Sequence, residues 1–381
     1  MLRVLVAFAV LAATALVAAA PLAMVAVCET LDGRAIGLAL LALSLTPGAV
    51  ALASGRRAAA ALAGTATALA LGAFVLVRQP AGTGDPASGL TSHWLEPAGF
   101  VALSPANLIP ELDQIKLEDS AFKPVIQRYF GDSYTGCVSY QLPVQRELHQ
   151  LPEWRALGSS GMHEGWSEVF SKVVFDRPRA PRHWYQYVPP HAPGERLPVV
   201  VFFHGFGSNA KHDLWCWKSL AERARFALIE PSMGFGLIPE GGLQLDRFLA
   251  EWRQDPDLDW SRAFVAGLSN GSVRAARAPT YHPGTFRGVI LLSPIVRGVA
   301  ECGNATGMLP YPPVLAIHGA LDGFVTPAYM RERQKQLTAR GVRFTLATYA
   351  DMDHYVNFRA RDRWHADVAR FMKDCEGLGP N

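Results

Sequence analysis

The sequence predicts an α/β domain, with a mostly parallel sheet and helices on both of its faces, preceded by about three transmembrane helices. Three observations support this prediction. Long uncharged stretches fill the first 78 residues, short apolar runs alternate with helical patterns after residue 197, and glycine-, serine- and histidine-containing motifs follow several of those runs. Strands that alternate with helices are typical of a parallel sheet covered on both faces.

The N-terminal part contains three uncharged stretches, at residues 4–28, 35–55 and 58–77. Each is close to the ~20 residues that a helix needs to cross a bilayer. We therefore expect a multi-pass membrane segment over residues 1–78, with the lipid bilayer as a partner. The alternative is a cleaved signal peptide followed by two buried helices.

Arginines between these stretches predict the orientation. Arg3 precedes the first stretch and Arg56–Arg57 precede the third. The positive-inside rule places both positions in the cytoplasm, which puts the chain after residue 78 on the extracytoplasmic side. The signal-peptide alternative leads to the same side.

Residues 79–180 are interpreted as a linker and accessory region. Residues 79–92 are rich in Gly, Pro and small polar residues, as in a flexible linker. Strands are expected at Phe170–Phe175 and His183–Tyr187 because of their β-branched and aromatic content. No catalytic residue is expected in this region.

Four cysteines follow the membrane part: Cys137, Cys216, Cys302 and Cys375. An even number in an exported domain is consistent with two disulfides, for which three pairings exist. Four free buried thiols are the alternative, and the sequence does not distinguish them.

Residues 181–378 are expected to form the catalytic domain. Strands are predicted by apolar runs and helices by 3.6-residue periodicity between them. The expected strands are 198–203, 227–229, 264–266, 288–292, 314–317 and 344–348; the expected helices are 217–223, 243–252, 329–339 and 364–373.

The first motif is Gly267-Leu-Ser269-Asn-Gly271, which follows the expected strand 264–266. The pattern G-x-S-x-G between a strand and a helix is typical of a nucleophile elbow, in which a sharp turn exposes the serine hydroxyl. Glycines are needed there because backbone approaches backbone closely. Ser269 is the predicted nucleophile.

The second motif is His204-Gly-Phe-Gly207, directly after the strand 198–203. A glycine-rich loop at this position can direct a backbone N–H towards a developing oxyanion. The predicted oxyanion donors are the N–H groups of Phe206 and Asn270. His204 itself is expected to hold the loop and not to act as a base.

The remaining two motifs supply a base and an acid. His354 lies after the strand 344–348, and histidine is suited to proton transfer near neutral pH. Asp322 follows the strand 314–317 and is the predicted acid that orients the imidazole. Asp351 and Asp353 are rival acids, but close sequence neighbours rarely point back at their own imidazole.

The order Ser269, Asp322, His354 is the order of the α/β-hydrolase superfamily. Residues 183–378 resemble this superfamily, in particular its small esterases and its members similar to polyhydroxybutyrate depolymerases or dienelactone hydrolases. The resemblance implies an α/β-hydrolase fold and a serine esterase that needs neither a cofactor nor a metal. Its substrate would be a small-molecule or polymeric carboxylic ester, cleaved through an acyl-enzyme.

Two other functions remain open: a serine peptidase of the same fold, and a membrane-tethered binding protein that has lost activity. The charge distribution excludes a nucleic-acid partner. The net charge of +3 is accounted for by the first 78 residues, and the rest carries 31 basic and 31 acidic side chains. No basic surface tract is therefore expected for a phosphate backbone. The oligomeric state is not predicted.

Overall fold

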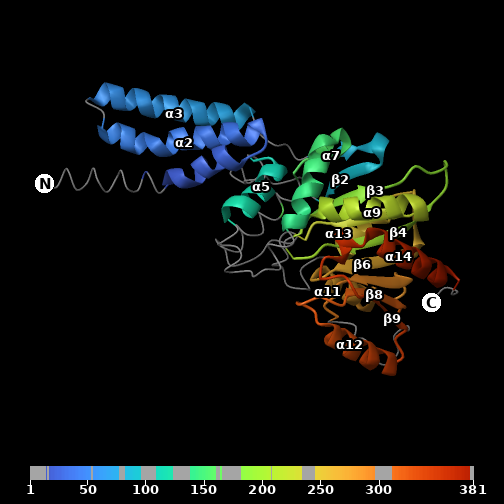
Figure 1. Cartoon of the computed structure of the whole chain (residues 1–381). Coiled ribbons are helices and arrows are strands. Elements are labelled where there is room, and N and C mark those ends of the chain that lie inside the picture. Colours follow the sequence, from blue (N-terminus) through green and yellow to red (C-terminus); the bar gives the residue numbers. More distant parts are fainter. Residues whose placement is uncertain are drawn as a thin grey trace. The chain divides into compact units, whose positions relative to one another are not determined.

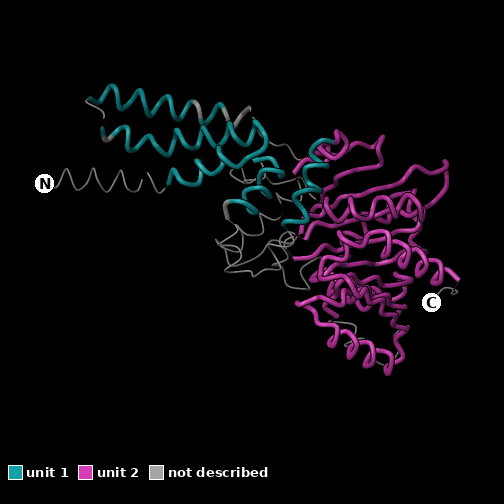
Figure 2. Tube along the Cα trace, viewed as in Figure 1, with its two compact units in different colours: residues 1–81, 100–150 teal, residues 82–99, 151–381 magenta. Residues whose placement is uncertain are grey.

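The computed structural model divides the chain into two compact units, residues 1–81 with 100–150 and residues 82–99 with 151–381 (Figures 1 and 2). The structure describes residues 14, 17–52, 55–76, 82–95, 109–122, 138–159, 164, 182–206, 208–233, 245–296 and 311–377. The expected strand Phe170–Phe175 lies outside these residues.

Two long helices, α2 (Leu31–Leu52) and α3 (Arg56–Leu76), form a hairpin in the first unit (Figure 1). A shorter apolar helix covers Val17–Val27. Among the described residues, one helix is long and apolar enough to cross a membrane, over Leu31–Val50. The described residues therefore contain one candidate span and not the expected three. Helix α3 matches α2 in length but is rich in alanine, which is only weakly apolar. Most of residues 4–16 lies outside the described residues.

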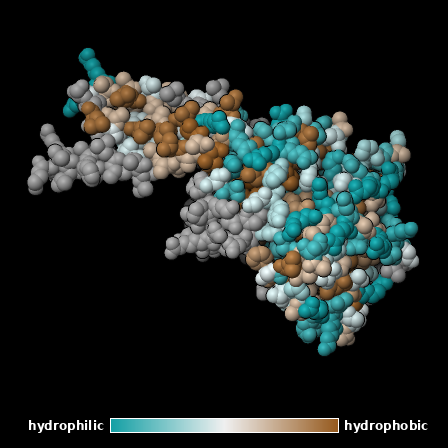
Figure 3. Space-filling view, in the orientation of Figure 1, coloured by the Kyte–Doolittle hydropathy of each residue, from teal (hydrophilic) through white to brown (hydrophobic). Residues whose placement is uncertain are grey.

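The surface of this hairpin is apolar along its length (Figure 3). Its exposed large side chains include Leu38, Leu45, Leu62 and Leu71. Water-exposed leucines in this number are unusual on a soluble helix pair, which normally hides one apolar face and presents a polar one.

Residues after the hairpin contact the turn that precedes α2. Asp113, in α5 (Glu111–Leu117), is fully buried and accepts hydrogen bonds from the backbone N–H groups of Glu29 and Thr30 at 2.6 and 3.2 Å. Arg146, in the helical residues 138–150, forms an ion pair with Glu29. A five-residue π-helical turn, η2 (Glu118–Phe122), continues α5.

The second unit is built on one nine-stranded sheet with the order β1-β2-β3-β5-β4-β6-β7-β8-β9. Strands β4 to β9 run parallel, and β1 to β3 add an antiparallel edge. The strands are β1 (Gly84–Asp85), β2 (Leu90–Trp94), β3 (His183–Tyr187), β4 (Leu197–Phe203), β5 (Ala227–Pro231), β6 (Leu258–Leu268), β7 (Gly288–Leu292), β8 (Val314–Gly319) and β9 (Phe344–Tyr349).

Helices cover both faces of this sheet (Figure 1). Helices α9, α13 and α14 lie on one face, where Trp217 packs between Phe202 of β4 and Trp364. The other face carries the larger core, to which α10, α11 and α12 contribute. The helices are α9 (Ala210–Ala224), α10 (Leu245–Trp252), α11 (Gly271–Tyr281), α12 (Pro327–Ala339), α13 (Val356–Arg359) and α14 (Arg361–Glu376), with α7 (Pro152–Ala156) and the short 3-10 turn η1 (Pro86–Ser88) near β1. The predicted α/β architecture with a mostly parallel sheet is confirmed.

Two expectations need correction. The residues expected to form a linker include β1 and β2, and Leu90–Trp94 pairs along its whole length with β3. The sheet therefore begins well before residue 181. Cys216 and Cys375 are free buried thiols, so the pairing of all four cysteines in two disulfides is wrong. Cys137 and Cys302 lie outside the described residues.

Candidate active site

Ser269 lies at the turn between β6 and α11, at the carboxyl edge of the parallel strands. Its φ of 49° is in the left-handed region that a serine rarely adopts, as a nucleophile elbow requires. Gly267 and Gly271 make the turn sterically possible. A Cβ on Gly267 would lie 2.6 Å from the carbonyl carbon of Gly271, and one on Gly271 would collide with the carbonyl oxygen of Phe203.

The predicted nucleophile, base and acid form one chain of hydrogen bonds. Ser269 Oγ lies 3.0 Å from His354 Nε2, and His354 Nδ1 lies 2.8 Å from Asp322 Oδ2. A carboxylate can only accept, so Nδ1 carries the proton and Nε2 is free to accept the serine proton. Residues separated by 85 and 32 positions along the chain thus meet at one edge of the sheet.

The environment of Asp322 keeps it ionised. Its side chain is fully buried, and burial alone would disfavour the charge. The hydrogen bond from His354 and those from the backbone N–H groups of Val325 and Phe324 outweigh that burial and lower the pKa of Asp322. The acid is therefore charged throughout the neutral range.

The rival acids serve other partners. Asp353 forms an ion pair with Arg359 and accepts the backbone N–H of Tyr355, while Asp351 pairs with Arg363. Neither is recorded in contact with the imidazole of His354, and Asp322 occupies that position.

The loop that follows β4, called the oxyanion loop after its predicted role, contains His204 and Phe206. His204 is buried, and its ring nitrogens interact with the carbonyl of Gly205 at 2.9 Å and the backbone N–H of Met233 at 2.8 Å. Burial lowers the pKa of His204 to about 4, so the ring is neutral and holds the loop. Phe206 lies in this loop, and Asn270 directly precedes α11, at the N-terminal end where backbone N–H groups are unsatisfied by the helix.

One residue that holds the base was not predicted from the sequence. Ser293 follows β7 with a φ of 43°, and its hydroxyl donates a hydrogen bond of 2.7 Å to the backbone carbonyl of His354. A serine directly after a predicted parallel strand was the available signal, because it must lie at the same edge as Ser269.

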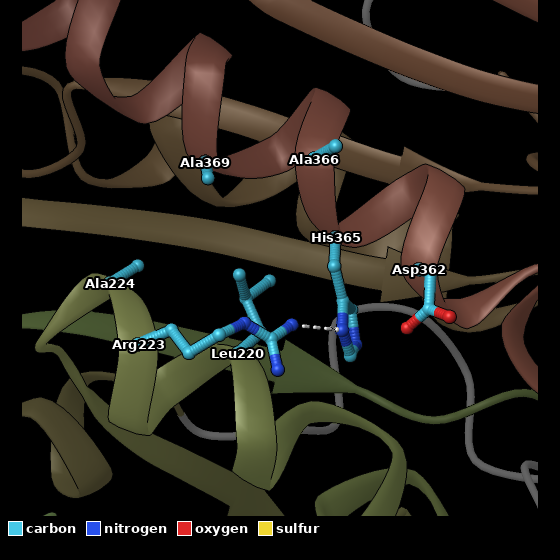
Figure 4. Close-up of a pocket in the computed structure, with 7 residues that line it drawn as sticks. All are labelled: Leu220, Arg223, Ala224, Asp362, His365, Ala366 and Ala369. Carbon is cyan, nitrogen blue, oxygen red and sulfur yellow. Dashed lines mark hydrogen bonds between the residues drawn. The ribbon is translucent and has the colours of Figure 1, made fainter.

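A pocket of about 380 Å³ lies elsewhere, between α9 and α14 (Figure 4). His365 lines it and accepts a hydrogen bond from Arg223, while its Nε2–H donates to the carbonyl of Cys216. Burial lowers the pKa of His365 to about 4. The histidine is thus neutral with both nitrogens satisfied, and it offers the pocket no base.

Metal chemistry has no prepared site in the described part of the chain. No group of three or more His, Cys, Asp or Glu side chains is arranged there to hold a metal ion. The hydrogen-bonded serine, histidine and aspartate are the chemical groups that define the candidate site.

Comparisons with known proteins give a family match and similar solved structures. The model of the prolyl oligopeptidase family matches residues 297–378, which include His354 and Asp322. Among solved structures, Est1E from Butyrivibrio proteoclasticus is similar at 16% identity and a TM-score of 0.42, over 51% of this chain and 94% of that chain. No curated protein sequence matches the chain.

Two further structures show the same range of similarity. A butyrate-bound esterase from Thermogutta terrifontis is 16% identical, with a TM-score of 0.41, over 52% of this chain and 91% of its own. A protein from Bacteroides ovatus assigned as a dipeptidyl aminopeptidase IV is 16% identical, with a TM-score of 0.42, over 50% of this chain and 33% of its own.

The fold assignment rests on the strand order, the elbow at Ser269 and the family-model match. The C-terminal part of this chain is an α/β-hydrolase-fold domain similar to the prolyl oligopeptidase family.

Proposed function

We propose that the protein is a membrane-tethered serine hydrolase that cleaves carboxylic esters. The observation that carries this proposal is the hydrogen-bonded chain from Ser269 through His354 to Asp322, with bond lengths of 3.0 and 2.8 Å. Such a chain activates a hydroxyl that is otherwise a weak nucleophile.

Acylation begins when Ser269 Oγ attacks the ester carbonyl carbon and its proton passes to His354 Nε2. The carbonyl oxygen gains the negative charge, which the N–H groups of Phe206 and Asn270 stabilise in this proposal. The C–O bond to the alcohol then breaks, and the histidine returns the proton to the departing alkoxide. The acyl group remains on Ser269 as an ester.

Deacylation repeats these steps with water. His354 accepts a proton from water as its oxygen attacks the acyl-enzyme, and the proton then goes to Ser269 Oγ as the carboxylic acid leaves. Asp322 keeps its charge in both halves and stabilises the imidazolium. The pathway consumes one ester and one water and needs no redox partner.

Exposed apolar side chains around the site favour a substrate with an apolar group. Phe324 is 52% exposed and sets its ring edge-on to His354, with 5.3 Å between centroids. Leu321, beside the acid, is 65% exposed, and Phe206 of the oxyanion loop is 38% exposed. Covering such surface with an acyl or alkyl group is favourable at about 25 cal/mol per Å².

Purified full-length chain in detergent should hydrolyse p-nitrophenyl butyrate, and Ser269→Ala should lower kcat about 10³-fold or more because the nucleophile is lost. The control is Ser261→Ala, which makes the same substitution on an exposed part of β6. Ser272 is less suitable because its hydroxyl donates a hydrogen bond to the carbonyl of Ser269 in the elbow. Equal rates for wild type and Ser269→Ala would leave only the binding function.

A peptidase is the second candidate, and the match to the prolyl oligopeptidase family favours it. An aminoacyl-prolyl p-nitroanilide assayed beside p-nitrophenyl esters separates the two. A higher kcat/KM for the amide than for every ester would support the peptidase and overturn the esterase.

We also propose that the α2–α3 hairpin is the membrane anchor. The contacts of Asp113 and Arg146 with the turn before α2 support this arrangement, because they require the chain after α3 to return to the side of Glu29. If α2 crosses the bilayer, α3 must therefore cross back.

The positive-inside rule places that shared side outside the cytoplasm. Protease added to sealed right-side-out vesicles should then digest the hydrolase unit. Complete protection of the unit until detergent is added would contradict the orientation.

A further inference from the structure

The carboxylate of Asp213 lies buried in the first turn of α9 and joins two distant parts of the candidate site. Its side chain has no exposed surface. Oδ2 accepts a hydrogen bond of 2.8 Å from the hydroxyl of Ser208, and Oδ1 accepts one of 3.1 Å from the amide of Asn357.

The two partners belong to the segments that carry the proposed catalytic groups. Ser208 is two residues after Phe206, in the loop that supplies one proposed oxyanion donor. Asn357 is three residues after His354, in α13, and is itself 1% exposed, with its carbonyl accepting the indole N–H of Trp364. One side chain thus links the oxyanion loop to the histidine segment across 144 positions of sequence.

Two contacts of the histidine segment come from different parts of the fold. Ser293 binds the carbonyl of His354 from the end of β7, and Asp213 binds Asn357 from α9 on one face of the sheet. The first contact ties the histidine to the sheet. The second ties it to the oxyanion loop, because Asp213 also accepts the hydrogen bond from Ser208.

A buried carboxyl group at this position is unfavourable unless its hydrogen bonds compensate for the loss of water. Burial raises the pKa of Asp213 to about 7, and the hydrogen bonds from Ser208 and Asn357 only partly oppose that effect. A second carboxyl, Glu230 on β5, is buried nearby, and its two oxygens have no hydrogen-bond partner among the described residues. Burial raises its pKa well above the usual range. The bridge to Ser208 and Asn357 is what distinguishes Asp213 from Glu230.

We propose that Asp213 is a positioning residue that sets the separation between the oxyanion donor at Phe206 and the base His354. This inference rests on the proposed hydrolase function. The donor and the base act on the same tetrahedral intermediate, so small changes in their separation weaken transition-state binding more than ground-state binding.

Asp213→Ala removes both hydrogen bonds and should lower kcat for p-nitrophenyl butyrate by about 10- to 100-fold with KM changed less than about 3-fold, since misplacement of catalytic groups acts on the chemical step. Asp213→Asn should restore kcat to within about 3-fold of wild type. Its amide oxygen can accept from Asn357, and its amide nitrogen can donate to the Ser208 hydroxyl, which both donates and accepts.

A different result is expected if Asp213 only stabilises the fold. Its loss would lower the fraction of active protein, which the far-ultraviolet circular dichroism and the thermal midpoint of the full chain in detergent report, while kcat per folded molecule stays at the wild-type value. Wild-type kcat in folded Asp213→Ala would overturn the proposal.

If Asp213→Ala does not fold, substitutions of its hydrogen-bond partners Ser208 and Asn357 test the positioning role. Ser208→Ala, Asn357→Ala and the double variant each keep the buried carboxylate. If the two contacts act together through Asp213, the second substitution lowers kcat less than the first. The product of the two single-variant fold-losses in kcat is then larger than the fold-loss of the double variant. Losses that multiply to the double-variant value would show two independent contacts and overturn the proposal.

A different result would contradict the proposed hydrolase function itself. If the wild-type chain hydrolyses no ester or amide substrate, the hydrolase itself is wrong. Activity in the wild type that is independent of Asp213, Ser208 and Asn357 would contradict the positioning role alone.

Discussion

Among single residues, burial decides which histidine can act as the base. His204, His212 and His354 all lie near the carboxyl edge of the sheet. Burial lowers the pKa of His204 to about 4 and that of His212 to about 3, so both are neutral and fixed in the interior. The His354 side chain keeps 12% of its surface exposed and contacts both a hydroxyl and a carboxylate. That combination allows proton transfer to a substrate.

Asp213 provides a test of these electrostatics through the pH dependence of stability. The ordinary pKa of aspartate is 3.8, and the folded-state pKa of Asp213 is about 7. Between these pH values the folded state keeps a proton that the unfolded state has lost. The stability contributed by the protonated form is therefore complete below pH 3.8 and is lost as the pH rises to about 7.

Asp213→Asn has no such proton to lose. The free energy of unfolding of this variant, relative to wild type, should rise by roughly 1 kcal/mol per pH unit across this window. Urea unfolding of the full chain in detergent at pH 4, 5, 6 and 7 measures the difference. A difference that stays constant with pH would contradict the raised pKa.

Among the elements, the packing of α11 against β4 fixes the position of the nucleophile. Gly271 begins α11, and a Cβ there would collide with the carbonyl oxygen of Phe203 and lie 2.5 Å from that of His204. The helix can therefore approach the strand only through a glycine. The same contact brings the elbow close to the oxyanion loop that follows β4.

Gly271→Ala should lower the free energy of unfolding by about 1–3 kcal/mol, as overpacking does, and should lower kcat because the elbow moves away from His354. Gly64→Ala in α3 is the control, since a Cβ at Gly64 meets no described atom within 4 Å. Thermal unfolding and ester hydrolysis of both variants test this prediction. Equal stability of the two variants would contradict it.

The strands of the parallel sheet were predictable because each is a continuous apolar run, as burial on both faces requires. Strand β2 was not predictable in this way. Its sequence, Leu90-Thr-Ser-His-Trp94, has three consecutive polar residues between two apolar ones, and it follows a Gly- and Pro-rich segment that is typical of a linker. The pairing with β3 overrides that local signal, and β3 lies 89 residues further along the chain.

The candidate triad was predictable for a topological reason. Carboxyl ends of parallel strands share one edge, so Ser269, Asp322 and His354 had to converge once each was placed after a strand. Asp213 was not predictable, because its role depends on a contact with Asn357 that no local pattern encodes. Free Cys216 and Cys375 likewise could not be distinguished from paired cysteines by their number.

For the molecule as a whole, an apolar hairpin and an α/β-hydrolase unit occur in one chain. The described residues give the first unit a surface of exposed leucines, and they give the second a hydrogen-bonded serine at the edge of its sheet. These features together support a hydrolase that works beside a membrane. Activation of Ser269 by His354 is the central claim, and every catalytic step depends on it.

Labelling with a fluorophosphonate probe, followed by peptide mass mapping of the full chain, tests this activation most directly. The probe phosphonylates a serine efficiently when a neighbouring base accepts the hydroxyl proton as the oxygen attacks phosphorus. We expect a single adduct on the peptide that contains Ser269, and we expect no adduct there in His354→Ala. Labelling of Ser269 at the wild-type rate in His354→Ala, or no labelling of Ser269 in the wild-type protein, would contradict the account.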